Sequence, residues 1–280
     1  MTAVRGALLV GAVACGPDIS QPTVVDELTV LGLSARPPEV GPGDLLQLDV
    51  RVVDPDRVGF DLLVWLCTSD DYRCLEAGPD PRPLDGWTRV IRGASPQETV
   101  LFPVPASFEL LLPEPAVTVG FVVWALACAP GRCPIVDAVA AAPEAGSEAW
   151  STVVERLSEP TSLIEGTTFE EANLSFRRLV FSTRPPEERN QPPVLLRVGD
   201  APLEVETGGE LVLSFTSVDA LYLYPYATGG EFQYRFYAMT GGAASLAWLA
   251  PELPGRFELF AFATDGLGGE VWWEGVVNVQ

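Results

Sequence analysis

Hydrophobic and polar residues alternate in short runs along most of this chain. The runs LLQLDVRVV, LVLSFTSV and RFELFAFAT carry apolar residues at every second position, and turns rich in Gly, Pro and Asp separate them. A period of two is typical of strands that bury one face and expose the other. The pattern therefore predicts an all-β fold.

One segment follows the helical period instead. Within GSEAWSTVVERL, apolar residues fall at positions i, i+3, i+4 and i+7, namely Trp150, Val153, Val154 and Leu157. Ser147 is placed to cap the start of a helix, and Pro160 lies beyond its end. We therefore expect one helix here, packed on the edge of the strands.

The chain also contains an internal repeat. Residues 37–54 align without gaps on residues 202–219, and six positions match: Glu39 with Glu204, Val40 with Val205, Gly43 with Gly208, Leu46 with Leu211, Leu48 with Leu213, and Asp54 with Asp219. A second block, ASFELLLPEP from Ala106, aligns on ASLAWLAPEL from Ala244. Two blocks in the same order indicate a duplicated module.

Each copy resembles the PKD-like and related immunoglobulin-like repeats of bacterial surface proteins. The segments that carry the resemblance are PGDLLQLDVRVVDPD followed by LLVWLC, and YRFYAMTGG followed by WLAPELPGRFELFAFATDGLGG. The resemblance implies two tandem immunoglobulin-like β-sandwiches of about 100 residues or more each. We expect the first over residues 27–183, a proline-rich extended linker over 184–191 that separates the modules, and the second over 192–280.

The same resemblance implies a strand order. In the first module, strand B covers 45–53, strand C 62–67, strand F 119–128 and strand G the segment NLSFRRLVFST. In the second module, B covers 211–218, C 232–238, F 256–264 and G the segment EVWWEGVVNV. The predicted helix then lies in an insertion between the last two strands of the first module.

The N-terminal segment has the order of an export signal. Arg5 precedes the apolar run from Ala7 to Val13, and Cys15 follows the small residue Ala14. The run is shorter than the roughly 20 apolar residues of a membrane span. The sequence AVAC resembles the lipobox of bacterial lipoproteins, which implies cleavage after residue 14, acyl chains on Cys15 and a tether over 15–26. The alternative is a buried N-terminal strand with an incidental cysteine.

The composition limits the reactions and ligands that this chain can support. The chain has no histidine, and its 17 basic residues, all arginine, are outnumbered by 38 acidic ones, which gives a formal net charge of −21. Catalysis or zinc binding that needs histidine is therefore excluded. Such a charge repels phosphate backbones, so we expect no nucleic-acid partner. No pattern for a cofactor is present, and we expect a protein without enzymatic activity.

Four cysteines follow the candidate anchor: Cys67, Cys74, Cys128 and Cys133. An even number in an exported chain indicates two disulfides, with a four-thiolate zinc site as the alternative. Under the strand order implied by the resemblance, Cys67 and Cys128 lie about 20 Å apart. A disulfide needs Cα atoms within about 7 Å. We therefore expect the local pairs Cys67–Cys74 and Cys128–Cys133.

Two further groups of residues are candidates for binding. Five tyrosines gather in one region, at Tyr222, Tyr224, Tyr226, Tyr234 and Tyr237. They are expected to cover the junction between modules, to form an exposed face for a ligand, or to join the core. Acidic turns containing Asp54 and Asp56, Asp70 and Asp71, or Asp265 suggest weak calcium candidates, although solvated turn residues explain them as well.

These observations predict an outer-membrane lipoprotein of the bacterial cell envelope, periplasmic or surface-exposed. Its partners would be the membrane, through Cys15, and an envelope protein or a glycan. The expected role is a non-catalytic binding or structural module. The alternative is a hydrolase in the first module that uses carboxylates or calcium in place of histidine.

Overall fold

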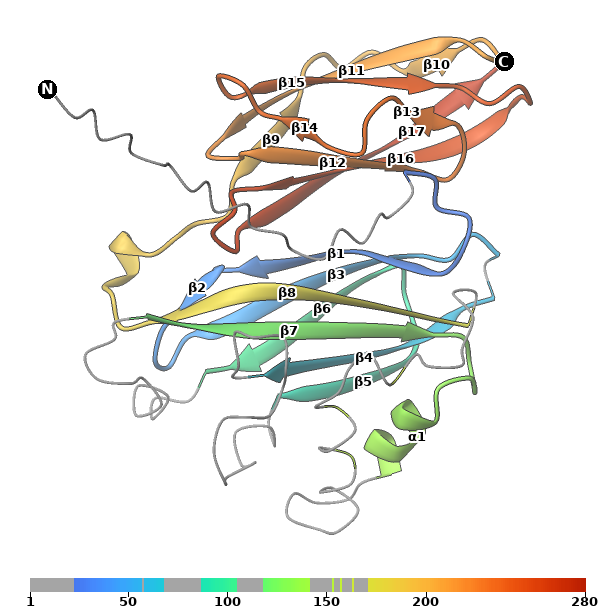
Figure 1. Cartoon of the computed structure of the whole chain (residues 1–280). Coiled ribbons are helices and arrows are strands. Elements are labelled where there is room, and N and C mark those ends of the chain that lie inside the picture. Colours follow the sequence, from blue (N-terminus) through green and yellow to red (C-terminus); the bar gives the residue numbers. More distant parts are fainter. Residues whose placement is uncertain are drawn as a thin grey trace, which may run out of the picture.

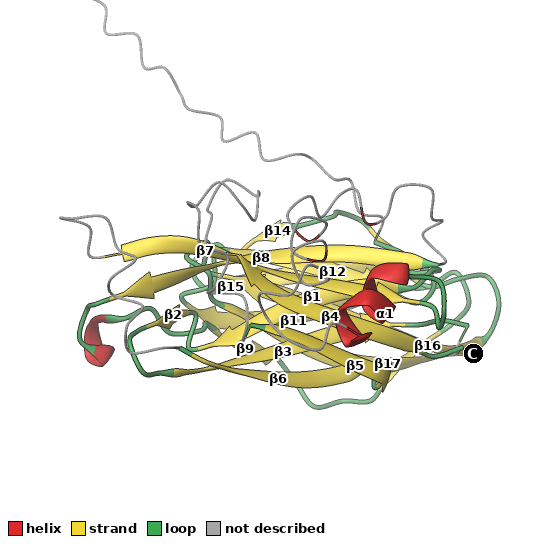
Figure 2. Cartoon of the chain, turned by 90° about the horizontal axis from the view of Figure 1, so that it is seen from below, coloured by secondary structure: helices red, strands yellow, loops and turns green. Residues whose placement is uncertain are grey.

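The computed structural model describes residues 23–56, 58–67, 87–104, 118–141, 153, 157, 163 and 171–280. In these residues, four β-sheets pack in pairs as two sandwiches, which lie one above the other (Figure 1). Strands dominate, and helices are confined to short segments (Figure 2). The fold is all-β with two immunoglobulin-like sandwiches in tandem.

The first sandwich pairs a three-stranded sheet, in the order β1-β3-β6, with a five-stranded sheet in the order β2-β8-β7-β4-β5. Its strands are β1 (Thr29–Arg36), β2 (Glu39–Val40), β3 (Leu45–Val53), β4 (Phe60–Cys67), β5 (Thr88–Ala94), β6 (Gln97–Pro103), β7 (Thr118–Cys128) and β8 (Ala172–Ser182). All pairings are antiparallel except β2 with β8.

The second sandwich pairs a four-stranded sheet, β13-β15-β11-β9, with a five-stranded sheet, β10-β17-β16-β12-β14. Its strands are β9 (Val194–Arg197), β10 (Leu203–Val205), β11 (Glu210–Val218), β12 (Tyr222–Ala227), β13 (Glu231–Phe232), β14 (Tyr237–Ala238), β15 (Ala243–Leu249), β16 (Gly255–Thr264) and β17 (Glu270–Val279). Here β10 runs parallel to β17, as β2 does to β8.

The strand orders confirm the duplication. The order β1-β3-β6 corresponds to β9-β11-β15, and β2-β8-β7-β4-β5 corresponds to β10-β17-β16-β12-β14. The first repeat block places β3 on β11 as predicted. The second block is wrong, because Leu46 pairs with Phe102 as Leu211 pairs with Trp248, so β6 and not the segment from Ala106 is the counterpart of β15.

Each sandwich has its own apolar core. Leu46, Leu48, Val50 and Val52 of β3 alternate into the first core, and Leu213 and Phe215 of β11 enter the second. The period-two pattern read from the sequence is therefore the alternation between core and outer face.

One predicted strand of the second module is wrong. Strand C was expected over 232–238, but β12 pairs with β16 over its whole length, which makes Tyr222–Ala227 strand C. The expected segment forms only the two-residue strands β13 and β14. Pro225 lies in β12 past its short pairing with β14, which covers Tyr222 and Leu223, and proline is accepted at such open edges.

The insertion between β7 and β8 covers the outer face of the first module's five-stranded sheet. Helix α1 (Pro134–Ala141) buries Ile135 and Val136 there, and Figure 1 places it at the end of the molecule away from the second sandwich. Val153 and Leu157, two residues of the predicted helix, are helical and buried in the same cluster. Trp150 and Val154 lie outside the described residues.

A disulfide joins Cys128, the last residue of β7, to Cys133, just before α1, with a Cα–Cα distance of 5.9 Å. Cys67 pairs with Val122, six positions before Cys128 on β7, so the two cysteines are separated as the strand order implied. Its expected partner Cys74 lies outside the described residues, so the pair Cys67–Cys74 remains a prediction. Within the part of the chain that the structure describes, no helix is long and apolar enough to span a membrane.

Candidate functional site

Polar and apolar side chains meet between the two sandwiches. We call this contact the joint. Its apolar part consists of Leu31 and Val53 of the first sandwich, Phe260 and Phe262 of the second, and Val25, which precedes the first strand. Tyr226 and Trp272 pack against its margin. The two modules therefore meet through the outer faces of their sheets.

The chain approaches this joint most closely at Gly32. A Cβ atom there would overlap the ring of Phe262, so a side chain at this position requires that ring or the two sheets to shift. The sequence gives no local sign of this constraint, because Phe262 is 230 positions further along the chain. Glycine permits a contact that any other residue would disrupt.

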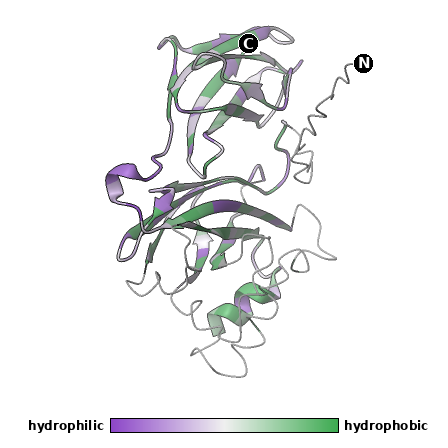
Figure 3. Cartoon of the chain, turned by 60° about the vertical axis from the view of Figure 1, so that its left-hand side comes forward, coloured by the Kyte–Doolittle hydropathy of each residue, from purple (hydrophilic) through white to green (hydrophobic). Residues whose placement is uncertain are grey.

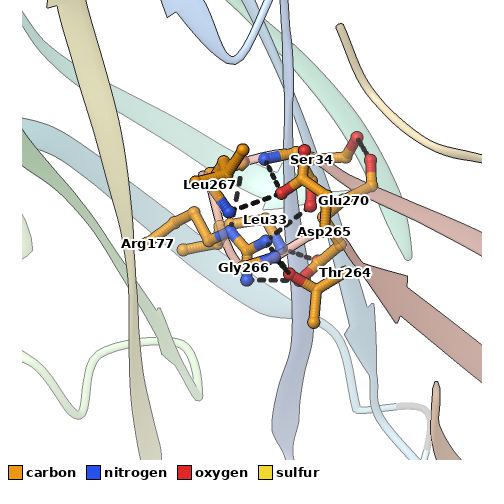
Figure 4. Close-up of polar contacts among 10 residues, drawn as sticks. Leu33, Ser34, Arg177, Thr264, Asp265, Gly266, Leu267 and Glu270 are labelled. Atoms are coloured by element: carbon orange, nitrogen blue, oxygen red, sulfur yellow. Dashed lines mark hydrogen bonds and ion pairs between the residues drawn. The ribbon is translucent and has the colours of Figure 1, made fainter. Parts of the chain in front are cut away.

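Glu270, the first residue of β17, is the polar centre of the joint (Figure 4). Its Oε1 accepts the backbone N–H of Leu33 at 3.1 Å, and its backbone oxygen accepts the hydroxyl of Ser34 at 2.5 Å. Both partners belong to β1, an edge strand of the first sandwich. A carboxylate of the second module therefore satisfies an edge donor of the first.

Arg177 of β8 neutralises this carboxylate from the other sheet of the first module. Its Nη1 lies 2.9 Å from Oε2 of Glu270, and both side chains are largely buried. Its Nη2 donates to Oγ1 of Thr264 at 2.8 Å and to the backbone oxygen of Gly269 at 2.9 Å. One arginine thus holds both ends of the β16–β17 turn.

Burial dominates the electrostatics of Glu270. It raises the pKa of the carboxyl above the usual range for glutamate, and the Asp265 carboxylate raises it further. The guanidinium of Arg177 and the N–H of Leu33 act in the opposite direction without cancelling the effect of burial. A buried ion pair of this kind costs desolvation free energy and is valuable mainly for fixing one arrangement.

The linker belongs to the joint as well. Residues Pro186–Glu188 form a short 3₁₀ helix, the hydrophilic turn at the side of both modules in Figure 3. The backbone N–H of Asn190 donates to Glu39 of the first sandwich at 2.9 Å, and its Nδ2 donates to Asp265 of the second at 2.7 Å. The linker therefore ties the modules together instead of separating them.

Two further contacts extend the joint. The guanidinium of Arg51 lies 5.1 Å from the ring centre of Phe260, and its Nη2 lies 3.0 Å from a carboxylate oxygen of Glu274. At the start of the described chain, Val25 donates to the backbone oxygen of Ala227 at 2.7 Å, and Ala227 donates to Thr23 at 2.8 Å. Residues 23–25, expected in the tether, thus pair with the second sandwich.

The five predicted tyrosines do not form one group. Tyr226 packs edge-on against Phe262 in the joint, and burial raises the pKa of its phenol well above the ordinary value. Tyr237 packs against the second core, and Tyr234 contacts Tyr237. Tyr222 and Tyr224 remain exposed on the same face of β12 as Tyr226, beside the joint.

Phe236, which the sequence reasoning missed, completes an exposed cluster with Tyr222 and Tyr224. Its ring centre lies 6.1 Å from that of Tyr222 and 6.3 Å from that of Tyr224, at interplanar angles of 77° and 40°. We call these three residues the aromatic patch. The sequence carries a signal for this residue, because Phe236 lies between Tyr234 and Tyr237.

The calcium candidates are not brought together. Asp54 accepts the backbone N–H of Gly59 within its own turn. Asp265 accepts the N–H groups of Leu267 and Gly269 with Oδ1 and the amide of Asn190 with Oδ2, which makes it a structural turn residue. In the described ranges, no three acidic or cysteine residues gather as metal ligands do. Cys15, Asp70 and Asp71 lie outside those ranges.

One pair of carboxylates does converge in the first module. Asp61 of β4 and Asp137 of α1 both contact Arg92, at 2.5 Å and 2.6 Å. The shared arginine offsets part of their negative charge and connects helix α1 to the sheet. Carboxylates held in this way are poorly suited to act as the acid and base of a glycosidase.

Comparisons with known proteins give no family. No protein-family description matches the chain. No curated protein matches it in sequence. Among solved structures, the chain is similar to the D0-D1 domain of intimin at 11% identity and a TM-score of 0.25, over 89% of this chain and 98% of that one.

Two other solved structures show likeness of the same degree. Dpr2 Ig1-Ig2, solved in complex with DIP-Theta Ig1-Ig3, has 11% identity and a TM-score of 0.24 over 92% of this chain and 95% of that one. Dimeric latent PorU from Porphyromonas gingivalis has 9% identity and a TM-score of 0.25 over 93% and 24%. Such low TM-scores carry no argument, and the immunoglobulin-like assignment rests on the strand order.

Proposed function

We propose that this chain is a non-catalytic, protein-binding module of the bacterial cell envelope. In this proposal, acyl chains on Cys15 hold it to the outer membrane, and the aromatic patch contacts the partner. The observation that carries the proposal is the exposure of Tyr222 and Tyr224, both packed against the exposed ring of Phe236, on a surface beside the joint.

The geometry of the patch favours a protein over a glycan. Sugars stack on flat aromatic faces, whereas the ring of Phe236 is tilted by 77° and 40° from its two neighbours. Rings tilted in this way do not present one flat surface on which a sugar could stack. Clustered tyrosine and phenylalanine side chains with restricted rotamers are typical of the centres of protein interfaces.

The joint supports the same role, because it fixes the patch relative to the rest of the molecule. Tyr224 lies close enough to the charges of Arg177 and Glu270 for them to affect the pKa of its phenol, although partial burial has the largest effect and raises that pKa. A recognition surface beside a rigid contact loses little conformational entropy on binding.

Site-specific photocrosslinking in intact cells tests the proposal. A benzophenone amino acid at Tyr224 is expected to give an adduct with a distinct envelope protein, whereas the same group at Leu253 is not. Leu253 is a matched control because it is 74% exposed and precedes the start of β16, while Tyr222 pairs with Thr264 at the other end of that strand.

A triple variant completes the test. Tyr222→Ala with Tyr224→Ala and Phe236→Ala is expected to lose co-purification of the crosslinked protein, while Leu253→Ala retains it. Equal amounts of the co-purified protein with the native chain and the triple variant would contradict protein recognition by the patch. Binding to a glycan array that is lost in the triple variant would contradict it as well. Absence of any adduct at position 224 contradicts a binding role for this surface.

A further inference from the structure

The outer face of the second module's four-stranded sheet is apolar over most of its extent. This sheet lies on the side of the second sandwich away from the first, at the top of Figure 1. Six of its large apolar residues, or residues directly beside it, are more than half exposed: Val194, Leu196, Val198, Val212, Val218 and Leu249.

Strand register places these side chains on one surface. Thr216 pairs with Leu196 and Val218 with Val194, while Val212 pairs with Ala247. Ser214 lies at the middle, and its hydroxyl is 3.1 Å from that of Ser245 on the neighbouring strand. We call this surface, formed by the outward residues of β9, β11 and β15, the outer apolar face.

Charged side chains are confined to one end of this face. Its outward positions carry valine, leucine, alanine, serine and threonine, and acids occur only at one end, where Glu210 and Glu231 both pair with Leu249. The chain as a whole has 38 acidic residues and a net charge of −21. A largely uncharged surface on such a chain is notable, because contiguous exposed apolar patches mark interaction sites.

We propose that the outer apolar face is the contact between two copies of this chain, related by a two-fold axis. Like-charge repulsion opposes most contacts between two molecules of charge −21, and this face is where two copies meet without bringing acids together. Contact through the same patch on each copy pairs apolar residues with apolar residues by symmetry.

The size of the face sets the expected strength. Three strands about 4.8 Å apart and up to nine residues long cover roughly 400 to 500 Å² on each copy. Two copies then bury about 900 Å², which is below the roughly 1,000 Å² expected of a stable interface and falls in the range of weak, transient contacts. The dimer should therefore be weak in solution, in the micromolar range, and favoured where anchoring concentrates the chains on a membrane.

Cysteine crosslinking in intact cells tests the contact on the native chain. Ser214→Cys, treated with a short bifunctional maleimide, is expected to give a covalent dimer of this chain, because a two-fold axis through the face brings residue 214 of both copies together. Ser95→Cys is the matched control, since Ser95 is exposed on the first sandwich and is expected to give none.

Introducing charged residues into the outer apolar face is the second test of the contact. Leu196→Glu with Val212→Glu, at positions 62% and 56% exposed, should abolish the Ser214→Cys dimer. In density-matched detergent, sedimentation equilibrium should show two chains for the native protein and one for this variant, with unchanged thermal unfolding. Leu253→Glu should remain dimeric.

Two results overturn the proposal. In the first, the native protein sediments as a monomer at all concentrations and Ser214→Cys gives no crosslinked dimer. This is the result expected if another segment of the same chain covers the face. The other is a Ser214→Cys adduct only with a different protein. Neither result bears on the proposed recognition by the aromatic patch, because that surface lies on the opposite sheet of the module.

Discussion

The Oε2 atom of Glu270 lies 2.9 Å from Nη1 of Arg177, although the two residues belong to different sandwiches. The same carboxylate accepts the backbone N–H of Leu33. One buried side chain thus connects β17 of the second module to both sheets of the first. A contact of this kind favours one angle between the modules, so we expect the two to behave as one unit.

The first prediction concerns the pH dependence of Glu270. Its pKa is raised in the folded state, so its contribution to stability is complete below the unfolded pKa of about 4.3 and is lost as the pH rises through the folded pKa. The free energy of unfolding of the native chain should therefore fall relative to that of Glu270→Gln as pH increases from 4 to 8.

Denaturant unfolding of both proteins across this range measures the difference. The other acidic residues are common to both chains and cancel in the comparison. A difference that stays constant with pH, or that changes in favour of the native chain as pH rises, contradicts the raised pKa.

The second prediction concerns Gly32. Gly32→Ala should lower the free energy of unfolding by about 1 to 3 kcal/mol, because the added methyl group overlaps the ring of Phe262. Phe262→Ala should remove much of this effect, so a double-mutant cycle should give a favourable coupling between the two changes. Additive changes would show that the two side chains do not meet.

The third prediction concerns the disulfide between Cys128 and Cys133. It closes a loop with a sequence separation of only 5 residues. Replacing both cysteines by serine should therefore cost about 2 kcal/mol and leave the fold intact, as measured by chemical unfolding. Loss of cooperative unfolding would mean that the bond supports the whole first module.

The fourth prediction concerns the proposed anchor. Cys15→Ala should move the protein from the membrane fraction to the soluble fraction. Several acyl chains give stable membrane binding, and this variant lacks the residue that would carry them. Mass spectrometry of the native protein should find residue 15 first and acylated. The Cys128→Ser and Cys133→Ser variant should stay on the membrane, and equal fractionation of all three proteins would exclude a lipid anchor.

The fold was largely predictable from local patterns. Alternation in 45–53 and 211–218 marked β3 and β11, and their shared positions revealed the duplication. Two elements were not predicted. Strand β12 at Tyr222–Ala227 contains Pro225, a residue that is uncommon within strands, but an open strand edge accepts it. Helix α1 was missed, although Pro134 at its first position and Asp137 in its first turn are helix-start signals.

The joint could not be predicted in the same way. Glu270 contacts Leu33 over a separation of 237 residues, and Asn190 contacts Glu39 over 151. No local period encodes such contacts, because they depend on how two finished sandwiches meet. The sequence did indicate part of the outcome, since covering the junction was one of the roles expected for the tyrosines, and Tyr226 packs there.

The central claim is that the two sandwiches form one rigid unit through the joint. Residual dipolar couplings of backbone amides, measured on the aligned protein, test it most directly. A single alignment tensor should fit the strands β1 to β8 and β9 to β17 together in the native chain. Two tensors of different magnitude or orientation, with either module fitted well alone, would contradict the claim.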